Sequence, residues 1–194
     1  TKALNEAIAA VVYTLNVTEA GYATMYLAHN AIIPDFDNEN GVYIVKSAIN
    51  GWAQMEKVTG ILPANTGVVV KGEGNYKFVY TQENATANVE GNLLEGTVAA
   101  TEIEEDAYVL GIVDGEVGLY KAKKASGVWL NNANKAYLPA DVVPASAALS
   151  AGFRFDFSGT TAIEEVETEV AETVIYDLTG RRVNALERGI YITG

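Results

Sequence analysis

From residue 11 onward, hydrophobic and polar positions follow the short alternating pattern that is typical of β-strands. Runs of about five to eight residues are rich in Val, Ile, Thr and Tyr and are separated by Gly or Asn. In the run YATMYL, residues 22–27, tyrosine and threonine alternate with alanine, methionine and leucine, as side chains do on the two faces of a strand. The pattern predicts an all-β fold for residues 11–158.

Tight turns join several of these runs. Asn50-Gly51 and Asp114-Gly115 each stand between two hydrophobic runs. Such dipeptides accept the positive φ angles of a two-residue hairpin turn at little cost, so each predicts a β-hairpin.

Two segments, residues 42–78 and 107–157, share the same order of features: a strand, a Gly turn, a second strand, an Ala-Asn turn and a third strand. The positions that match are Tyr43 with Tyr108, Gly51 with Gly115, Lys57 with Lys121, and Asn65 with Asn134. Two copies of one unit can bury their apolar faces against each other, which predicts a β-sandwich built from two related β units. The alternative is that β-hairpins simply look alike.

The two ends of the chain differ from this body. Residues 1–10 are rich in Ala and Leu and are interpreted as the end of an upstream helix or linker. Residues 159–172 are small, polar and acidic, which predicts a linker. Apolar residues at helical spacing from Ile163 to Val174 leave a short helix as the alternative.

Residues 173–194 predict a small β-meander. Val174–Tyr176 form a strand, Asp177 and Gly180 supply turn chemistry, and Gly189 marks a second turn before a final strand. Three short strands bury little surface, so such a tail needs another surface to lean on.

The motif IYDLTGRRV followed by GIYI resembles the C-terminal sorting segment of proteins that Bacteroidetes such as Bacteroides and Prevotella export through the type IX (Por) secretion system. The body is similar to β-repeats of large surface proteins of these bacteria. The resemblance implies a secreted or outer-membrane surface-attached protein whose tail contacts the secretion machinery. The residues that carry it are Tyr176, Asp177, Gly180, Arg181, Arg182, Gly189 and Tyr191. The alternative is a structural hairpin that completes a sheet.

Charge and composition exclude several classes of function. The net charge is −12, which repels phosphate backbones and excludes nucleic acid as a predicted partner. The chain has no cysteine, so disulfides, thiolate catalysis and thiolate metal sites are excluded. No apolar run approaches the roughly 20 residues of a membrane span.

The sequence shows no constellation that indicates an enzyme. The single histidine, His29, has neither a G-x-S-x-G motif nor an evident orienting partner, and is interpreted as a turn residue. We therefore predict no catalytic residues and no required cofactor.

The segment PDFDNENG contains the best local cluster of oxygen ligands. Asp35, Asp37 and Glu39 alternate along a predicted tight loop, and calcium prefers six to eight oxygen ligands. The spacing is not that of an EF-hand, because Lys46 stands where the bidentate Glu would be. A solvated β-loop is the default interpretation and a calcium site the alternative.

Four aromatic residues are candidates for binding a ligand: Trp52, Trp129, Tyr22 and Tyr26. Sugar rings stack on exposed Trp and Tyr, and Trp52 follows a tight turn, where side chains are often exposed. The alternative is core packing, which we favour for Trp129.

The sequence thus predicts a non-catalytic surface module, adhesive or architectural, at the C-terminus of a larger secreted protein. Its partners would be the secretion machinery through the tail and a glycan or another surface protein through the body. The alternative is a carbohydrate-binding module that serves a glycan-degrading enzyme.

Overall fold

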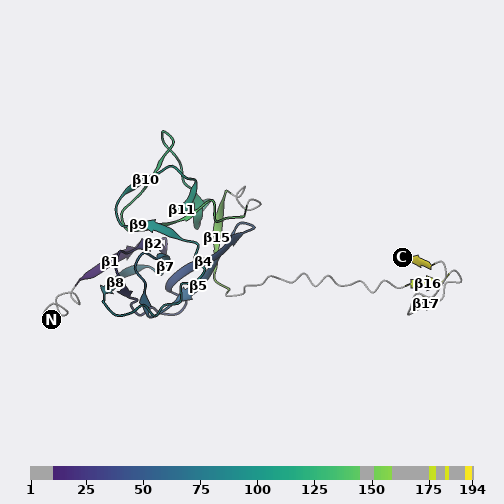
Figure 1. Cartoon of the computed structure of the whole chain (residues 1–194), viewed down its shortest axis with the longest axis horizontal. Coiled ribbons are helices and arrows are strands. Elements are labelled where there is room, and N and C mark those ends of the chain that lie inside the picture. The colour runs from purple at the N-terminus through teal and green to yellow at the C-terminus, as the bar shows by residue number, and fades with distance from the viewer. Residues whose placement is uncertain (1–10, 145–150, 159–174, 178–181, 184–190, 194) are drawn as a thin grey trace. The chain divides into compact units, whose positions relative to one another are not determined.

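The computed structural model describes residues 11–144 and 151–158, together with three short strands near the C-terminus (Figure 1). The described residues contain strands and no helix, which confirms the predicted all-β fold. The chain divides into two compact units, Thr1–Gly159 and Thr160–Gly194, and each is described by itself. The predicted upstream segment 1–10 and the predicted linker 159–172 lie outside the described residues.

A nine-stranded sheet with the order β2-β7-β4-β5-β15-β12-β11-β14-β9 is the framework of the first unit. Its strands are β2 (Tyr22–Tyr26), β4 (Gly41–Ile49), β5 (Trp52–Val58), β7 (Gly67–Lys71), β9 (Glu95–Thr97), β11 (Ala107–Val113), β12 (Glu116–Lys121), β14 (Lys135–Pro139) and β15 (Gly152–Asp156). All neighbours pair antiparallel except β5 and β15, which are parallel.

Two smaller sheets accompany this framework, with the orders β1-β8-β3-β6 and β10-β13. Their strands are β1 (Val12–Val17), β3 (Ala31–Ile32), β6 (Ile61–Leu62), β8 (Gly74–Tyr80), β10 (Thr101–Ile103) and β13 (Trp129–Asn131).

The strand registers show that the sheet contains one arrangement twice. In both halves a central strand lies between a hairpin partner and a third strand: β4 between β5 and β7, and β11 between β12 and β14. The central tyrosines pair at matching positions, which are Tyr43 with Lys57 and Val69 in the first half, and Tyr108 with Lys121 and Leu138 in the second. The predicted architecture of two related β units is confirmed.

The repeated arrangement starts earlier than the sequence prediction placed it. The pairs β2–β7 and β3–β6 of the first half correspond to β9–β14 and β10–β13 of the second. The predicted copies also extend too far, because β8 pairs with β1 and β3 whereas β15 pairs with β5 and β12. The boundaries 42–78 and 107–157 therefore need this correction. Short strands such as β3 and β10 leave too weak a pattern in the sequence to be matched.

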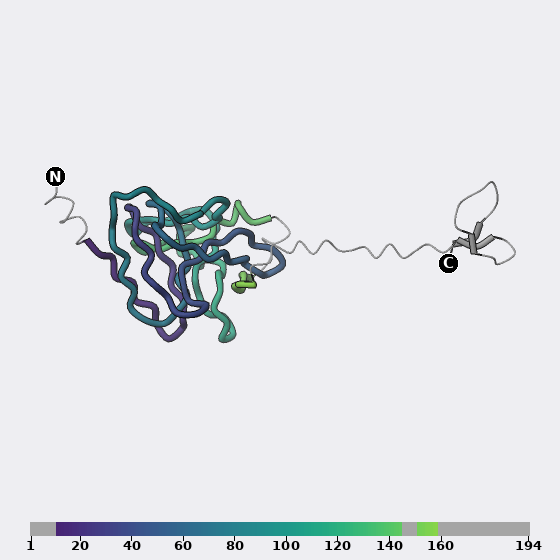
Figure 2. Tube along the Cα trace, turned by 90° about the horizontal axis from the view of Figure 1, so that it is seen from below, coloured from purple at the N-terminus to yellow at the C-terminus, as the bar shows by residue number. Residues whose placement is uncertain are grey.

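Both faces of the first half are buried. On β4, Val42 and Ile44 belong to a core that the sheet β1-β8-β3-β6 covers, whereas Tyr43 and Val45 face a second core. The second core joins the two halves through the buried side chains Tyr43, Met55, Val69, Tyr108, Leu119, Leu138 and Phe153. Figure 2 shows the purple-to-blue and teal-to-green parts of this unit packed against each other. The two halves thus bury their apolar faces on one another, as expected.

The two ends of the nine-stranded sheet approach each other at a seam between β2 and β14. The Tyr26 amide donates to the carbonyl of Asn134 at 3.0 Å, and Asn134 Nδ2 donates to the Tyr26 carbonyl at 2.9 Å. The ring of Tyr26 lies against Gly96 on β9, where an added Cβ would come within 2.5 Å of a ring carbon. The sheet therefore curls so that it is nearly closed.

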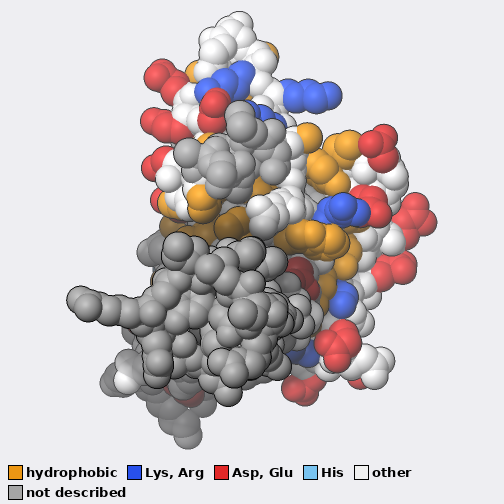
Figure 3. Space-filling view, turned by 90° about the vertical axis from the view of Figure 1, so that its right-hand side faces the viewer, with side chains coloured by type: hydrophobic (Ala, Val, Ile, Leu, Met, Phe, Trp, Pro, Cys, Tyr) orange, Lys and Arg blue, Asp and Glu red, His pale blue; other side chains and the backbone are white. Residues whose placement is uncertain are grey.

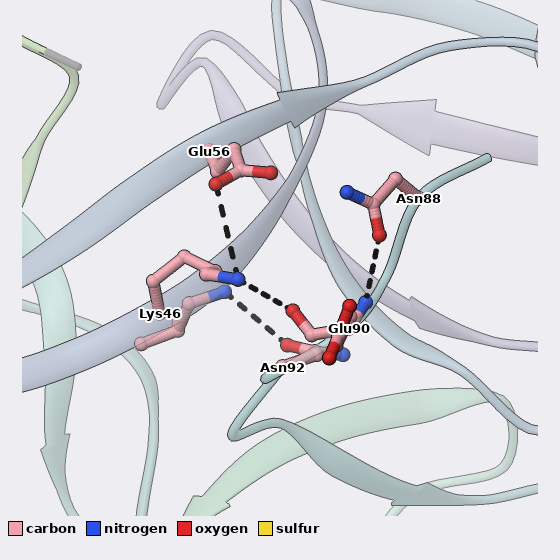
Figure 4. Close-up of polar contacts among 6 residues, drawn as sticks. Lys46, Glu56, Asn88, Glu90 and Asn92 are labelled. Atoms are coloured by element: carbon pink, nitrogen blue, oxygen red, sulfur yellow. Dashed lines mark hydrogen bonds and ion pairs between the residues drawn. The ribbon is translucent and has the colours of Figure 1, made fainter.

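The connection between β8 and β9 is anchored at an irregularity of β4. The register shifts between Val45 and Ser47, and Asn92 lies between β4 and Gly67, the first residue of β7. Its Oδ1 accepts from the Val45 amide at 3.2 Å, and its Nδ2 donates to the Gly67 carbonyl at 2.8 Å. Figure 4 shows Lys46 beside it, reaching Glu56 and the Glu90 carbonyl.

The three strands of the C-terminal unit are β16 (Ile175–Asp177), β17 (Arg182–Val183) and β18 (Tyr191–Thr193). They pair antiparallel, and the predicted β16–β17 hairpin is present. The order is β17-β16-β18, so the last strand pairs with the first rather than with the second. This order differs from the meander expected from the sequence.

Candidate functional site

Trp52 lies at the surface, at the start of β5. The preceding turn has φ angles of 52° at Asn50 and 78° at Gly51, the left-handed conformation that this dipeptide favours. The Trp52 side chain is 46% exposed, and its antiparallel partner Ile49 is exposed to a similar extent. A large aromatic ring is thus held near a hairpin tip rather than in a core.

Arg154 fixes the position of this ring. Trp52 and Arg154 are direct partners in the parallel β5–β15 pair, and the guanidinium carbon lies 4.7 Å from the centre of the indole ring. A cation over an aromatic face is attracted by the ring quadrupole. Arg154 also pairs with Glu116 at 3.2 Å. Both charged side chains are about half exposed, so this ion pair orients the arginine more than it stabilises the fold.

Tyr120 lies beside Arg154 and Glu116, and its ring rests over three glycines of neighbouring strands. A Cβ added at Gly152 or Gly118 would meet the Tyr120 ring at 2.3 Å or 3.3 Å, and one at Gly111 at 3.5 Å. The phenol hydroxyl donates to the Glu116 carbonyl at 3.0 Å. The absence of three side chains on neighbouring strands therefore lets the ring lie close to the sheet.

Together Trp52, Arg154, Glu116 and Tyr120 form what we name the outer platform. A hollow of about 570 Å³ lies between the two hairpin tips, lined by Glu116, Tyr120 and Arg154 together with residues of both turns. The tip of the β4–β5 hairpin, drawn in dark blue, projects to the right in Figures 1 and 2. Figure 3 shows this side of the molecule, where hydrophobic side chains gather between charged ones. Exposed apolar side chains of the two hairpins are Ile49, Ile112 and Val113.

The outer platform combines the groups that recognise polar rings. An indole face offers stacking to the apolar face of a ligand ring, and a guanidinium and a carboxylate offer several hydrogen bonds to hydroxyl groups. The four residues come from β5, β12 and β15, and therefore from both halves of the repeat and the strand between them.

The other three candidate aromatics are placed elsewhere. Trp129 is only 5% exposed, its Nε1 donates to the Glu105 carbonyl at 3.0 Å, and its ring packs edge-on against Tyr137. Trp129 belongs to the core between the β10-β13 sheet and the second half of the nine-stranded sheet. Core packing is the alternative that the sequence analysis favoured for this residue. Tyr22 packs against Phe155 with ring centres 5.1 Å apart, and burial raises its pKa. Tyr26 covers Gly96.

The predicted calcium site comprises three exposed carboxylates, Asp35, Asp37 and Glu39. Lys57 Nζ donates to the Asn38 carbonyl at 3.1 Å, and the Tyr43 hydroxyl donates to the Glu39 carbonyl. Two main-chain oxygens of the loop are therefore already bonded, one to the ammonium group of Lys57 and one to the hydroxyl of Tyr43. Within the described part of the chain, no three His, Cys, Asp or Glu side chains lie close enough together to hold a metal ion. Asp35, Asp37 and Glu39 therefore do not converge as calcium ligands would.

The residues of the sorting-like motif fall only partly within the described strands. Those on β16, β17 and β18 are Tyr176, Asp177, Arg182 and Tyr191. Those outside the described residues are Gly180, Arg181 and Gly189.

Sequence reasoning identified Trp52 but missed Arg154, Glu116 and Tyr120. These residues lie far from Trp52 in the sequence, and only the parallel pairing of β5 with β15 brings them together. The one signal near Tyr120 in the sequence is the presence of Gly111 and Gly118 within the two hairpin strands, since a glycine inside a strand indicates a close approach to the backbone.

Two further findings bear on function. None of the described residues belongs to a helix with the length and hydrophobicity needed to cross a bilayer. Comparisons of the chain with protein-family models, with curated proteins and with solved structures find no match.

Proposed function

We propose that the chain is a non-catalytic carbohydrate-binding module and that its ligand contact is the outer platform. One observation carries the proposal: Trp52 is 46% exposed and is held in place by Arg154, whose guanidinium lies 4.7 Å from the ring centre. A ring that is already oriented loses little conformational freedom when it stacks on a ligand, which favours binding.

The neighbouring groups support a saccharide as the ligand. Arg154 and Glu116 present charged hydrogen-bonding groups beside the indole, and Tyr120 adds a second aromatic ring at the edge of the hollow. Pyranose rings offer an apolar face for stacking and hydroxyl groups at the rim. The hollow of about 570 Å³ is open enough for an internal segment of a polysaccharide chain.

Adhesion to another surface protein is the second candidate function. The exposed Ile49, Ile112 and Val113 extend the outer platform as an apolar rim, and contiguous apolar patches mark interaction surfaces. Both candidate functions fit the module of a larger surface protein that the sequence predicts.

The location of the protein is part of the proposal. The motif in residues 173–194 supports export by a type IX system of a Bacteroidetes bacterium, with the tail as the segment that the secretion machinery reads. Its three paired strands belong to a compact unit of their own, Thr160–Gly194. The body is then displayed outside the cell, secreted or attached to the outer membrane.

A glycan array tests the binding function. The wild type is expected to bind a restricted set of neutral polysaccharides, and Trp52→Ala to lose that binding. Val98→Ala is the matched control, because Val98 is an apolar side chain with the same exposed fraction of 46% outside the outer platform. An array with no ligand, or Trp52→Ala binding as the wild type does, would contradict the carbohydrate proposal.

A further inference from the structure

A second cleft lies at the seam between the two halves, away from the outer platform. We name it the seam cleft; its volume is about 450 Å³, and its walls come from β1, β2, β11, β13 and β14. It is therefore built where the ends of the nine-stranded sheet meet, whereas the outer platform is built around β15.

The charge of the seam cleft is opposite to that of the molecule. Its charged lining residues are Lys123 and Lys135, and no Asp or Glu lines it. The chain as a whole has 25 acidic and 13 basic residues. A cleft with low-dielectric walls focuses the field of the charges that line it, so the seam cleft attracts anions although the whole protein repels them.

Lys135 carries a positive charge that the described residues leave without a carboxylate. Its Nζ donates to the Thr24 carbonyl at 3.4 Å, and none of the salt bridges of the described residues involves it. The side chain is half-buried, and this burial lowers its pKa because water is partly removed from the ammonium group. An anion placed beside it would restore favourable interactions that the free protein lacks.

The remaining polar lining consists of neutral amides and hydroxyls. Asn16, Thr18 and Asn132 are exposed at the cleft, and Tyr22 contributes part of an aromatic edge. Asn16 uses its Nδ2 to bond Asn75 Oδ1 at 2.9 Å. Its own Oδ1 and the Asn132 amide are suited to ligand hydroxyls. Groups of this kind around two ammonium groups match a ligand that is both anionic and rich in hydroxyls.

We propose that the seam cleft is a second binding site, which takes an acidic saccharide unit whose carboxylate lies between Lys123 and Lys135. The volume of about 450 Å³ accommodates one or two sugar rings. The inference is independent of the outer platform, because the two sites share no residue.

Isothermal titration calorimetry of the full chain with digalacturonate tests the inference. The neutral counterpart of the same linkage, α-1,4-galactobiose, reports what the carboxylates contribute. We expect digalacturonate to bind at least about tenfold more tightly, and Lys135→Gln and Lys123→Gln each to weaken it by about tenfold. Lys123 is exposed, so its variant tests the site even if Lys135→Gln fails to fold.

Two controls give the test its specificity. Lys77→Gln removes an exposed lysine of β8 that does not line the cleft, and Trp52→Ala removes the outer platform; both are expected to leave digalacturonate binding unchanged. The inference is overturned if digalacturonate does not bind, if galactobiose binds equally well, or if Lys77→Gln weakens binding as much as the cleft variants do. Equal binding of inorganic sulfate would also overturn it, since the site would then recognise a bare anion.

Discussion

At the scale of single residues, Asn92 shows how one side chain replaces part of a β-sheet. The strand β7 begins at Gly67, and its pairing with β4 stops at Tyr43 and Val69, so Val45 has a strand partner on β5 but none on the β7 side. The Asn92 amide accepts from Val45 and donates to Gly67, as a main-chain amide of a neighbouring strand would. Its Oδ1 also accepts from the Leu94 amide at 3.2 Å.

We therefore expect Asn92→Ala to destabilise the fold by about 2 kcal/mol, because it leaves partly buried main-chain groups without partners. Asn88→Ala is the control, since Asn88 is exposed and bonds only the nearby Glu90 amide in the network of Figure 4. Urea unfolding of both variants measures the difference. Equal midpoints for the two would show that Asn92 does not anchor the loop.

Tyr137 predicts how stability depends on alkaline pH. Burial, followed by the charge of Glu95, raises its pKa from 10.0 to about 12. Above pH 10 the unfolded chain releases a proton that the folded chain retains, so the stability that Tyr137 contributes is complete below pH 10 and is lost as the pH rises towards 12. Burial also raises the pKa of four other tyrosines, Tyr13, Tyr22, Tyr43 and Tyr108. They add to the loss of folding stability at alkaline pH.

Tyr137→Phe is expected to make this alkaline decline shallower, because phenylalanine has no proton to lose. The Trp129 contact is retained, since the ring remains. Urea midpoints at neutral pH and at about pH 11 measure the slope. A decline as steep in the variant as in the wild type would contradict the assignment.

At the scale of secondary-structure elements, local sequence predicts the two hairpins, but it does not predict which other strands pair with them. Asn50 and Asp114 have φ angles of 52°, as the Asn-Gly and Asp-Gly turns predict. The parallel pairing of β15 with β5 joins segments that are distant in the sequence, and no local pattern specifies it. Trp52 could therefore be recognised from the sequence, but Arg154 beside it could not.

The glycines under Tyr120 provide a test at this scale. Gly118 and Gly111 are direct partners in the β11–β12 hairpin. A Cβ at Gly118 would lie 2.5 Å from the Phe153 carbonyl oxygen of β15, whereas at Gly111 its nearest contact is 3.5 Å from the Tyr120 ring. Gly118→Ala thus forces β12 and β15 apart, and Gly111→Ala does not.

We expect Gly118→Ala to cost more than about 2 kcal/mol of stability and Gly111→Ala less than about 0.5 kcal/mol. Thermal unfolding of the two variants makes the comparison, and each serves as the control for the other. If Gly118→Ala were tolerated as well as Gly111→Ala, the close approach of β12 to β15 would be wrong.

At the scale of the whole molecule, the repeat was predictable because tyrosine, glycine and asparagine anchors keep their order at nearly constant spacing. The seam was not predictable, since it depends on how the nine-stranded sheet curls and on hydrogen bonds such as Tyr26 to Asn134. The same curvature buries Trp129 in a core and packs the partly buried Tyr22 against another, while the hairpin tip leaves Trp52 exposed. Burial of an aromatic residue is thus decided by long-range packing that sequence patterns do not contain.

The central claim is that a saccharide stacks on Trp52, and fluorescence quenching tests it most directly. Acrylamide quenches the exposed Trp52 more than the buried Trp129, so the quenched fraction reports on the outer platform. With the glycan that the array identifies at saturation, we predict that quenching of Trp52 falls and that Trp52→Ala neither binds nor shows this protection. Saturation with unchanged quenching, or full affinity in Trp52→Ala, would contradict the account.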